Sequence, residues 1–321
     1  MSYAIAAGIA TGIALPHLLR LERAPPTSAA LLWFQSLALR ALASLFAAVY
    51  LLVYVPSAEP FHGLAHRCLH AALPVLTEHL GLETHDVGHL ATALPALLLG
   101  VSTLSVAIGI ARAARSVRRL LTLNGLGPGP RGSVIVGGAD VVLAAAGIRR
   151  PTVVVSAGAL TALDDDELFA GLDHENGHIA RRHGYVFAIA ALLRGLGRPI
   201  PGARRALREL SFHLERDADR WALARHNDPS ALASAICKAA GTRELEPAWL
   251  TGLASAGVMQ RLDQLLDPAQ SALKRARRLA LNGLAVTMAV FALAVTAVLP
   301  ATAAAGIEQL GTKTAPPHCE S

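Results

Sequence analysis

The chain has 321 residues, of which 53% are hydrophobic and only 16% are charged. Soluble domains carry about 25% charged residues, so a purely soluble globule is a poor description of this chain. The same values exclude a disordered protein, a coiled coil and a basic tail that coats nucleic acid, and we expect no nucleic-acid partner. The composition therefore favours a protein that lies partly in a lipid bilayer.

Four stretches are long and apolar enough, or nearly so, to cross a membrane, which requires about 20 mostly apolar residues. They are residues 3–19, 29–55 (interrupted only by Arg40), 89–111 and 279–305. A weaker apolar run at 185–200 contains two arginines and a proline, with a second proline directly after it, and we interpret it as a buried or interfacial helix.

Basic residues between these stretches predict their orientation, because Lys and Arg accumulate on the cytoplasmic side. The third stretch is followed by four arginines, the fourth is preceded by four basic residues, and the 56–88 loop has an acidic excess. We therefore expect a multi-pass protein of the cell membrane with the N-terminus outside. Three regions result: an N-terminal membrane region (1–111) with an outer loop (56–88), a cytoplasmic region (112–278), and a C-terminal span with a short outer tail (279–321).

The cytoplasmic region begins with a linker at 124–132 that is rich in Gly and Pro. Short β-branched runs at 134–136 and 152–155, with 141–143 between them, predict a small antiparallel sheet. Asp164 followed by Glu167 has the spacing of a capping box, which predicts a helix over about 165–182.

That helix carries His174, Glu175 and His178 in an H-E-x-x-H pattern. Residues four apart share one helix face, so both imidazoles can reach one metal ion, and Glu175 beside them can accept a proton from water. Zinc suits this chemistry, but a catalytic zinc needs a third protein ligand from elsewhere.

The best candidate for the third ligand is Glu215, on a second predicted helix at 203–225. Asp219 lies one turn further on the same face and is suited to accept the free ring N–H of a ligating histidine. His213, Glu215 and Asp219 interrupt an otherwise apolar helix, which is costly unless they have partners.

With these residues in place, segment 147–226 resembles the catalytic core of integral-membrane zinc metallopeptidases. Two related families share this core: the HtpX-like and CAAX prenyl protease family, and the BlaR-type sensor peptidases. The short distance in sequence from His178 to Glu215 slightly favours the BlaR-type family. The matching elements are residues 147–158, 163–167, 174–178 and 215–219. The resemblance implies that His174, His178 and Glu215 bind Zn²⁺ and that Glu175 is the general base. It also implies an edge strand at 152–156 that aligns a peptide substrate.

The fold class that follows is a mainly α membrane protein, with about four transmembrane helices and a zincin-like α+β catalytic domain containing a small antiparallel sheet. Asp173 and Asn176 depart from the apolar residues usual in the families, and Asp173 could alter the surroundings of the metal. His183, His213 and Arg220 are candidate donors to the oxyanion of the transition state. For His183 the alternative is a solvated helix end.

Features outside this core allow several interpretations. His62, His66 and His70 have helical spacing, and they could bind metal, sense pH or simply be solvated. Cys68 and Cys319 both fall outside by the topology and could form a disulfide, whereas Cys237 is expected to be a buried helix thiol.

The leading hypothesis is a membrane-bound zinc endopeptidase that cleaves protein or peptide substrates at the cytoplasmic face, with a regulator protein as a possible further partner. One alternative is a catalytically silent signalling or scaffold protein that keeps the zinc fold, although a structural zinc site needs no general base. Another is a metal-sensing membrane protein, suggested by the outer histidines.

Overall fold

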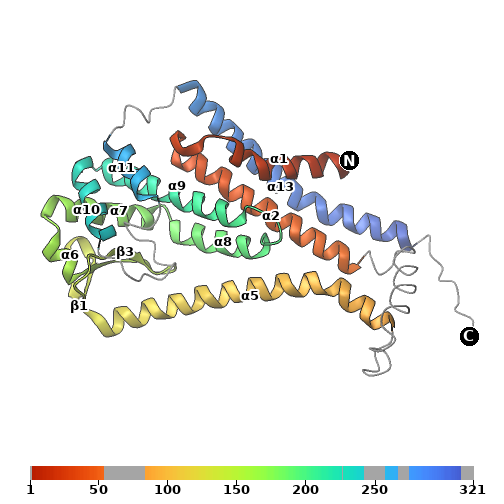
Figure 1. The fold of residues 1–321 in the computed structure, drawn as a ribbon, viewed down its shortest axis with the longest axis horizontal. Coiled ribbons are helices and arrows are strands. Elements are labelled where there is room, and N and C mark those ends of the chain that lie inside the picture. The colour runs from red at the N-terminus through yellow and green to blue at the C-terminus, as the bar shows by residue number, and fades with distance from the viewer. Residues whose placement is uncertain (1, 54–83, 226, 242–256, 267–274, 312–321) are drawn as a thin grey trace, which may run out of the picture.

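This computed structural model describes residues 2–53, 84–225, 227–241, 257–266 and 275–311. Three long helices run beside one another along the long axis of the molecule: α2 (Pro26–Val53), α5 (Thr84–Asn124) and α13 (Arg275–Gly311) (Figure 1). A shorter α1 (Ser2–Leu18) packs on α2 and is joined to it through the 3₁₀ turn η1 (Leu21–Arg23). The sheet and the helices that cover it lie at one end of this bundle, where α5 ends.

Three helices within the described residues are long and apolar enough to span a membrane, one each in α2, α5 and α13. The fourth expected span, residues 3–19, forms the 17-residue helix α1. At 1.5 Å per residue this helix is only about 26 Å long, shorter than the roughly 30 Å hydrocarbon core. Large apolar side chains stand exposed along α5 and α13, among them Leu97, Leu104, Val290 and Leu293, each at least 60% exposed.

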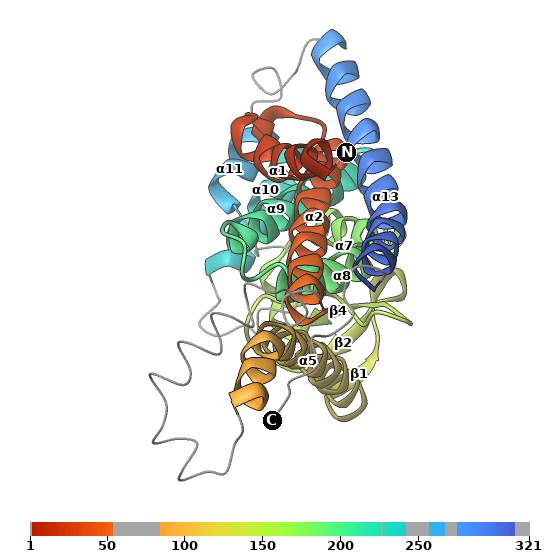
Figure 2. The ribbon, with the colours of Figure 1, turned by 90° about the vertical axis from the view of Figure 1, so that its right-hand side faces the viewer.

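The apolar run expected to be a buried or interfacial helix is α8 (His183–Leu196), which is followed by α9 (Ala203–Leu223). Both helices pack against α2, and α8 also contacts α5 (Figure 2). Arg40, the one charge within the second predicted span, is 1% exposed. Its Nε donates to the carbonyl of Pro201 at 3.1 Å, and its Nη2 lies 2.8 Å from His17 Nε2. The buried guanidinium thus joins α1, α2 and the α8–α9 turn.

The sheet has four strands in the order β1-β2-β4-β3, and it is mixed rather than antiparallel as predicted. The strands are β1 (Gly125–Pro128), β2 (Val134–Val136), β3 (Leu143–Ala146) and β4 (Thr152–Ser156). β3 and β4 form a hairpin whose turn begins at Gly147, a glycine with φ 95°. Because β4 returns into the position beside β2, these two strands run parallel.

The observed strands correct three expectations. The predicted linker contains a strand, β1, and the 3₁₀ turn η2 (Pro130–Gly132). β4 was expected at the edge, but it lies between β2 and β3, so the edge next to the helices is β3. The strand expected at 141–143 begins only at Leu143.

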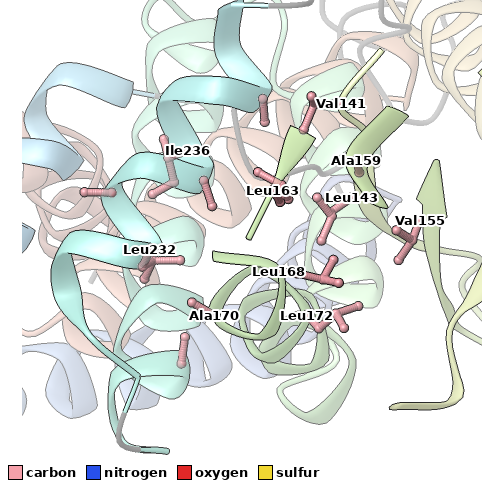
Figure 3. Packing of buried hydrophobic residues seen from close by; sticks show 14 of the residues in the cluster. Val141, Leu143, Val155, Ala159, Leu163, Leu168, Ala170, Leu172, Leu232 and Ile236 are labelled. Carbon is pink, nitrogen blue, oxygen red and sulfur yellow. The ribbon is translucent and has the colours of Figure 1, made fainter. Parts of the chain in front are cut away.

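The core of this end of the molecule lies between the sheet and the helices α7 (Asp165–Ala180) and α10 (Pro229–Gly241) (Figure 3). Leu143 from the sheet, Leu172 from α7, and Leu232 and Ile236 from α10 are at most 1% exposed. Each fully buried side chain of this size contributes about 1.5–3 kcal/mol. The helix α6 (Ala157–Ala162) follows β4 directly, and α11 (Val258–Leu266) packs on α10.

The capping box expected at the start of α7 is present: the Asp164 side chain accepts from the Glu167 N–H, and the Glu167 side chain accepts from the Asp164 N–H. Cys237 is exposed on α10, so the expectation of a buried thiol was wrong. Residues 84–88 of the expected outer loop belong to α5, whereas the part with His62, His66, His70 and Cys68 lies outside the described residues, as does Cys319.

Candidate metal centre

His174 and His178 lie one turn apart on α7 and point their Nε2 atoms toward each other at 3.2 Å. His174 is fully buried and His178 is 3% exposed. The capping box starts α7 ten residues before His174, and the core contacts of Leu168 and Leu172 orient the helix so that this face turns inward. Two imidazole nitrogens so close together require a proton or a cation between them, because two lone pairs repel.

The helix α9 brings Glu215 to the same point. Its Oε2 lies 3.3 Å from His174 Nε2, and its Oε1 lies 3.6 Å from His178 Nε2. A tetrahedral zinc with bonds of about 2.0–2.1 Å separates its ligand atoms by roughly 3.3 Å, which is close to these distances. The three side chains are buried, and their ligand atoms all lie within 4.8 Å of one another, so the residues fit a zinc ion.

Asp219 lies behind His174, with its Oδ1 2.9 Å from His174 Nδ1. An acceptor at this position favours the tautomer that carries its proton on Nδ1 and leaves Nε2 free as a ligand. The sequence suggested this role for Asp219, and the geometry allows it.

His178 has its own partner, which the sequence did not assign. Its Nδ1 lies 3.0 Å from His183 Nδ1, and His183 Nε2 lies 3.4 Å from Asp217 Oδ2. When Nε2 of His178 is free as a ligand, Nδ1 carries the proton and donates to His183, which in turn donates to Asp217. His183 is 3% exposed, so the alternative of a solvated helix end was wrong.

Arg261 on α11 is the second residue missed from the sequence. It is fully buried, with Nη1 3.0 Å from Glu215 Oε2 and its other nitrogens 2.6 and 2.8 Å from the Asp219 carboxylate. It compensates two buried carboxylates on α9 that would otherwise be very costly. Its position 46 residues after Glu215 offers no local pattern, and the only signal is one arginine among the apolar residues of an amphipathic helix.

Glu175 is fully buried, and its Oε2 accepts the backbone N–H of Ala145 at 2.6 Å. Burial raises the pKa of Glu175 to about 8, and the nearby charge of His174 only partly opposes this. Ala145 belongs to β3. The backbone hydrogen-bonding groups of Ala144, and of Val142 just before the strand, face β4. Since hydrogen-bonding groups alternate along a strand, the N–H and C=O of Ala145 point to the outer edge, toward the metal site.

The two histidines differ in their electrostatics. Burial alone would lower the pKa of His174, but Asp219 and Glu215 outweigh it and raise that pKa to about 9. Burial lowers the pKa of His178, which keeps that ring neutral. The pKa of Glu215 lies well below its usual value, because His178 and Arg261 outweigh its burial. The site therefore attracts positive charge, as a metal centre must.

The structure does not bring His213 and Arg220 into this cluster. Successive residues of a helix are rotated by 100°, so His213 lies nearly opposite Glu215 on α9. There its Nδ1 is 3.2 Å from Arg216 Nη1, and burial, assisted by that arginine, lowers the pKa of His213 to about 3. Arg220 lines a different cavity, together with residues of α2 and α13 such as Ser28 and Asn282. Neither is placed to donate to an oxyanion beside His174 and His178.

Asp173, one of the two departures from the residues usual in the families, also turns away from the metal ligands. Its Oδ2 lies 2.6 Å from Arg131 Nη1 and accepts from the amide of Asn227 at 3.0 Å. Arg225 lies 3.9 Å from its other oxygen. Asp173 therefore joins η2 to the end of α9.

Comparison with known proteins agrees with this geometry. The family model described as "Peptidase family M48" matches residues 115–198, which include the end of α5, the sheet, α7 and α8. A comparison with curated proteins finds no match. The matched segment contains His174, Glu175 and His178, and α9 adds Glu215. Together the family match and the cluster of two histidines and a glutamate support a zinc metallopeptidase family for this chain.

Proposed function

We propose that this protein is a membrane-bound zinc endopeptidase that hydrolyses peptide bonds of protein substrates at the cytoplasmic face of the cell membrane. One observation carries the proposal: a buried glutamate, Glu175, lies between a three-residue metal cluster and the free edge of a strand. A structural zinc site would need the cluster alone. A peptidase needs the metal cluster, the general base and a strand edge that holds the substrate.

His174, His178 and Glu215 would hold the metal, with Asp219 and His183 fixing the ring tautomers and Arg261 fixing the Glu215 carboxylate. A zinc ion there would supply Lewis-acid chemistry, polarising the scissile carbonyl and making water a stronger nucleophile at neutral pH. Glu175 takes the proton of the attacking water and passes it to the leaving amine. Its Oε2 is held by Ala145, whereas its Oε1 is buried without a hydrogen bond from the described residues and is available for this proton.

The substrate backbone would pair with β3. This strand ends the sheet formed by the described residues, and the C=O of Ala145 faces outward, whereas its N–H is donated to Glu175. A peptide added here as a further strand passes directly beside Glu175, so its scissile bond is positioned by main-chain hydrogen bonds. Peptide or protein substrates of extended conformation fit this edge.

The location follows from the three apolar helices and the basic residues at their ends. Arg112, Arg115 and Arg118 near the end of α5, and Arg278 at the start of α13, would lie on the cytoplasmic side with the metal centre. The bilayer is then a permanent partner. A BlaR-like subtype and a regulator protein as a further partner remain part of this proposal, supported by sequence resemblance alone.

The proposal is tested on the full-length protein in detergent. The number of zinc ions bound per chain and the rate of cleavage of an unfolded protein substrate are measured on the same preparation. Glu175→Gln should retain zinc and lose activity by about 10²–10⁴-fold, the usual contribution of a general base. Glu209→Gln removes a half-buried carboxylate of α9 that lies 3.9 Å from Arg205 and outside the candidate metal centre, and it should leave activity unchanged. Equal activity of the wild-type chain and Glu175→Gln, with zinc bound in both, would contradict the mechanism.

A further inference from the structure

A cavity of about 470 Å³ opens directly beside the metal centre. It is bounded by the β3–β4 turn on one side and by the end of α7 and the start of α8 on the other. His178 lines it, so the cavity reaches the metal ligands, and Ala145 lines it at the strand edge that would hold a substrate. A side chain of a peptide paired with β3 would enter this space.

The mouth of the cavity is basic. Arg149 from the β3–β4 turn and Arg182 from the start of α8 both line it, and both are exposed. No Asp or Glu belongs to the lining, and within the described parts of the chain neither guanidinium forms an ion pair with a carboxylate. Two unpaired cations at one opening attract a ligand that brings negative charge.

Arg182 lies between the end of α7 and the start of α8, and its N–H donates to the carbonyl of Ile179. It is the N-cap of α8, where Ser, Thr, Asp or Asn is preferred, and its side chain makes no capping hydrogen bond. Its backbone has φ 55°, the left-handed conformation in which many helices end, usually at a glycine. The guanidinium of Arg182 is therefore not used to cap α8, and it lines the cavity next to the metal ligands, where it can contact a ligand.

Next to this cavity the lining is apolar. A second cavity of about 90 Å³ shares Ala145, Gly147, Ile148 and Gly184 with the first, and its far wall is formed by α5 and α8. Its volume is below the roughly 150 Å³ that admits benzene in an engineered protein cavity. A small aliphatic side chain fits this second cavity better than an aromatic ring.

We infer that this cavity is a substrate subsite that selects a peptide carboxylate at its mouth, held by Arg149 and Arg182, next to a small aliphatic side chain. The inference rests on the proposed peptidase function. The carboxylate belongs either to an acidic side chain near the scissile bond or to the C-terminus of the substrate. Both present the same planar anion, which a guanidinium binds through two hydrogen bonds.

The experiment uses the full-length chain in detergent and quenched-fluorescence peptides of one Val/Ala sequence. In one series a single Glu moves from position to position, each peptide being paired with its Gln analogue, and in a second pair a free C-terminus is compared with an amide. Binding of the same peptides to Glu175→Gln is measured by fluorescence anisotropy, independently of turnover. We expect a Glu peptide, or the free acid, to be preferred by about tenfold or more, the size of one hydrogen bond to a charged group.

Arg149→Gln and Arg182→Asn should lower the ratio of acidic to neutral peptide binding toward one. Asn is chosen at position 182 because it tolerates the left-handed backbone conformation. Arg182→Lys should restore part of the preference for acidic peptides, and Arg204→Gln, an exposed arginine of α9 outside the cavity, should leave it intact. Equal binding and cleavage of acidic and neutral peptides at every position would overturn the inference, as would a failure to bind any of them. Selective binding without any cleavage by the wild-type chain would instead overturn the proposed function.

Discussion

The guanidinium of Arg261 lies 3.0 Å from the carboxylate of Glu215, the third candidate metal ligand, and joins α11 to the metal centre. The same group contacts Asp219, which lies behind His174. One arginine thus orients a metal ligand and the residue that positions another, so its loss should affect both metal binding and folding.

Arg261→Gln should lower zinc affinity by about 10–100-fold, the usual effect of losing a group that orients a ligand. It should also destabilise the protein by about 3–5 kcal/mol, because buried Glu215 and Asp219 lose their countercharge. Zinc competition with a chelator and thermal unfolding measure the two effects. Arg204→Gln, of equal charge change but exposed, is the control, and an unchanged zinc affinity in Arg261→Gln would refute the role.

His183→Phe should weaken zinc binding by about 10–100-fold through loss of the partner of His178 Nδ1. Phe keeps most of the buried volume, so the fold should remain. Asp217→Asn should have a smaller effect of the same sign, since it acts through His183. The readout is the zinc dissociation constant, and a value equal to that of the wild-type chain would show that His178 needs no such support.

Removal of zinc should lower the melting temperature of the chain. A ligand that binds only the folded state stabilises it by about 2.7 kcal/mol at a concentration 100 times its dissociation constant. Unfolding is followed with a chelator and after zinc is added back. His178→Ala should show no zinc-dependent shift, and a similar shift in both chains would place the bound zinc elsewhere.

The ion pair between Glu167 and Lys238, at 2.6 Å, predicts a pH-dependent contribution to stability. Burial raises the pKa of Glu167, but hydrogen bonds from Lys238, Ser234 and the Asp164 N–H outweigh it and lower the pKa. The contribution is therefore present above about pH 4.5, the value in the unfolded chain, and is lost as the pH falls through the lower folded value.

Glu167→Gln preserves the capping box but removes this charge. It should cost about 0.5–1 kcal/mol at neutral pH, and the difference from wild type should vanish in acid. Thermal unfolding between pH 3 and 7 measures this, with Asp166→Asn, exposed in the same turn, as the control. A difference that grows toward acid pH would contradict the assignment.

Local patterns in the sequence determined much of this protein. The capping box at Asp164 and Glu167 predicted α7 to within two residues of its end, and the 203–225 pattern predicted α9 equally well. The spacing of His174 and His178 predicted that they would meet, because one helical turn is a local relationship. The pairing with Glu215 followed only from the family resemblance and the cost of burying a charge.

Tertiary structure decided the rest. The edge strand beside the metal centre is β3 rather than β4, because the β3–β4 hairpin places its second strand in the middle of the sheet. The run of β-branched residues at 152–155 does not encode this order. His213 and Glu215 are neighbours in sequence, but they face opposite sides of α9, and only packing shows which side faces the metal. Arg261 and Ala145 reached the site from separate elements through long-range contacts, for which no local periodicity exists. The sequence by itself determined which residues can do the chemistry, and the packing of α9, α11 and β3 around α7 decided which of them are close enough to do it.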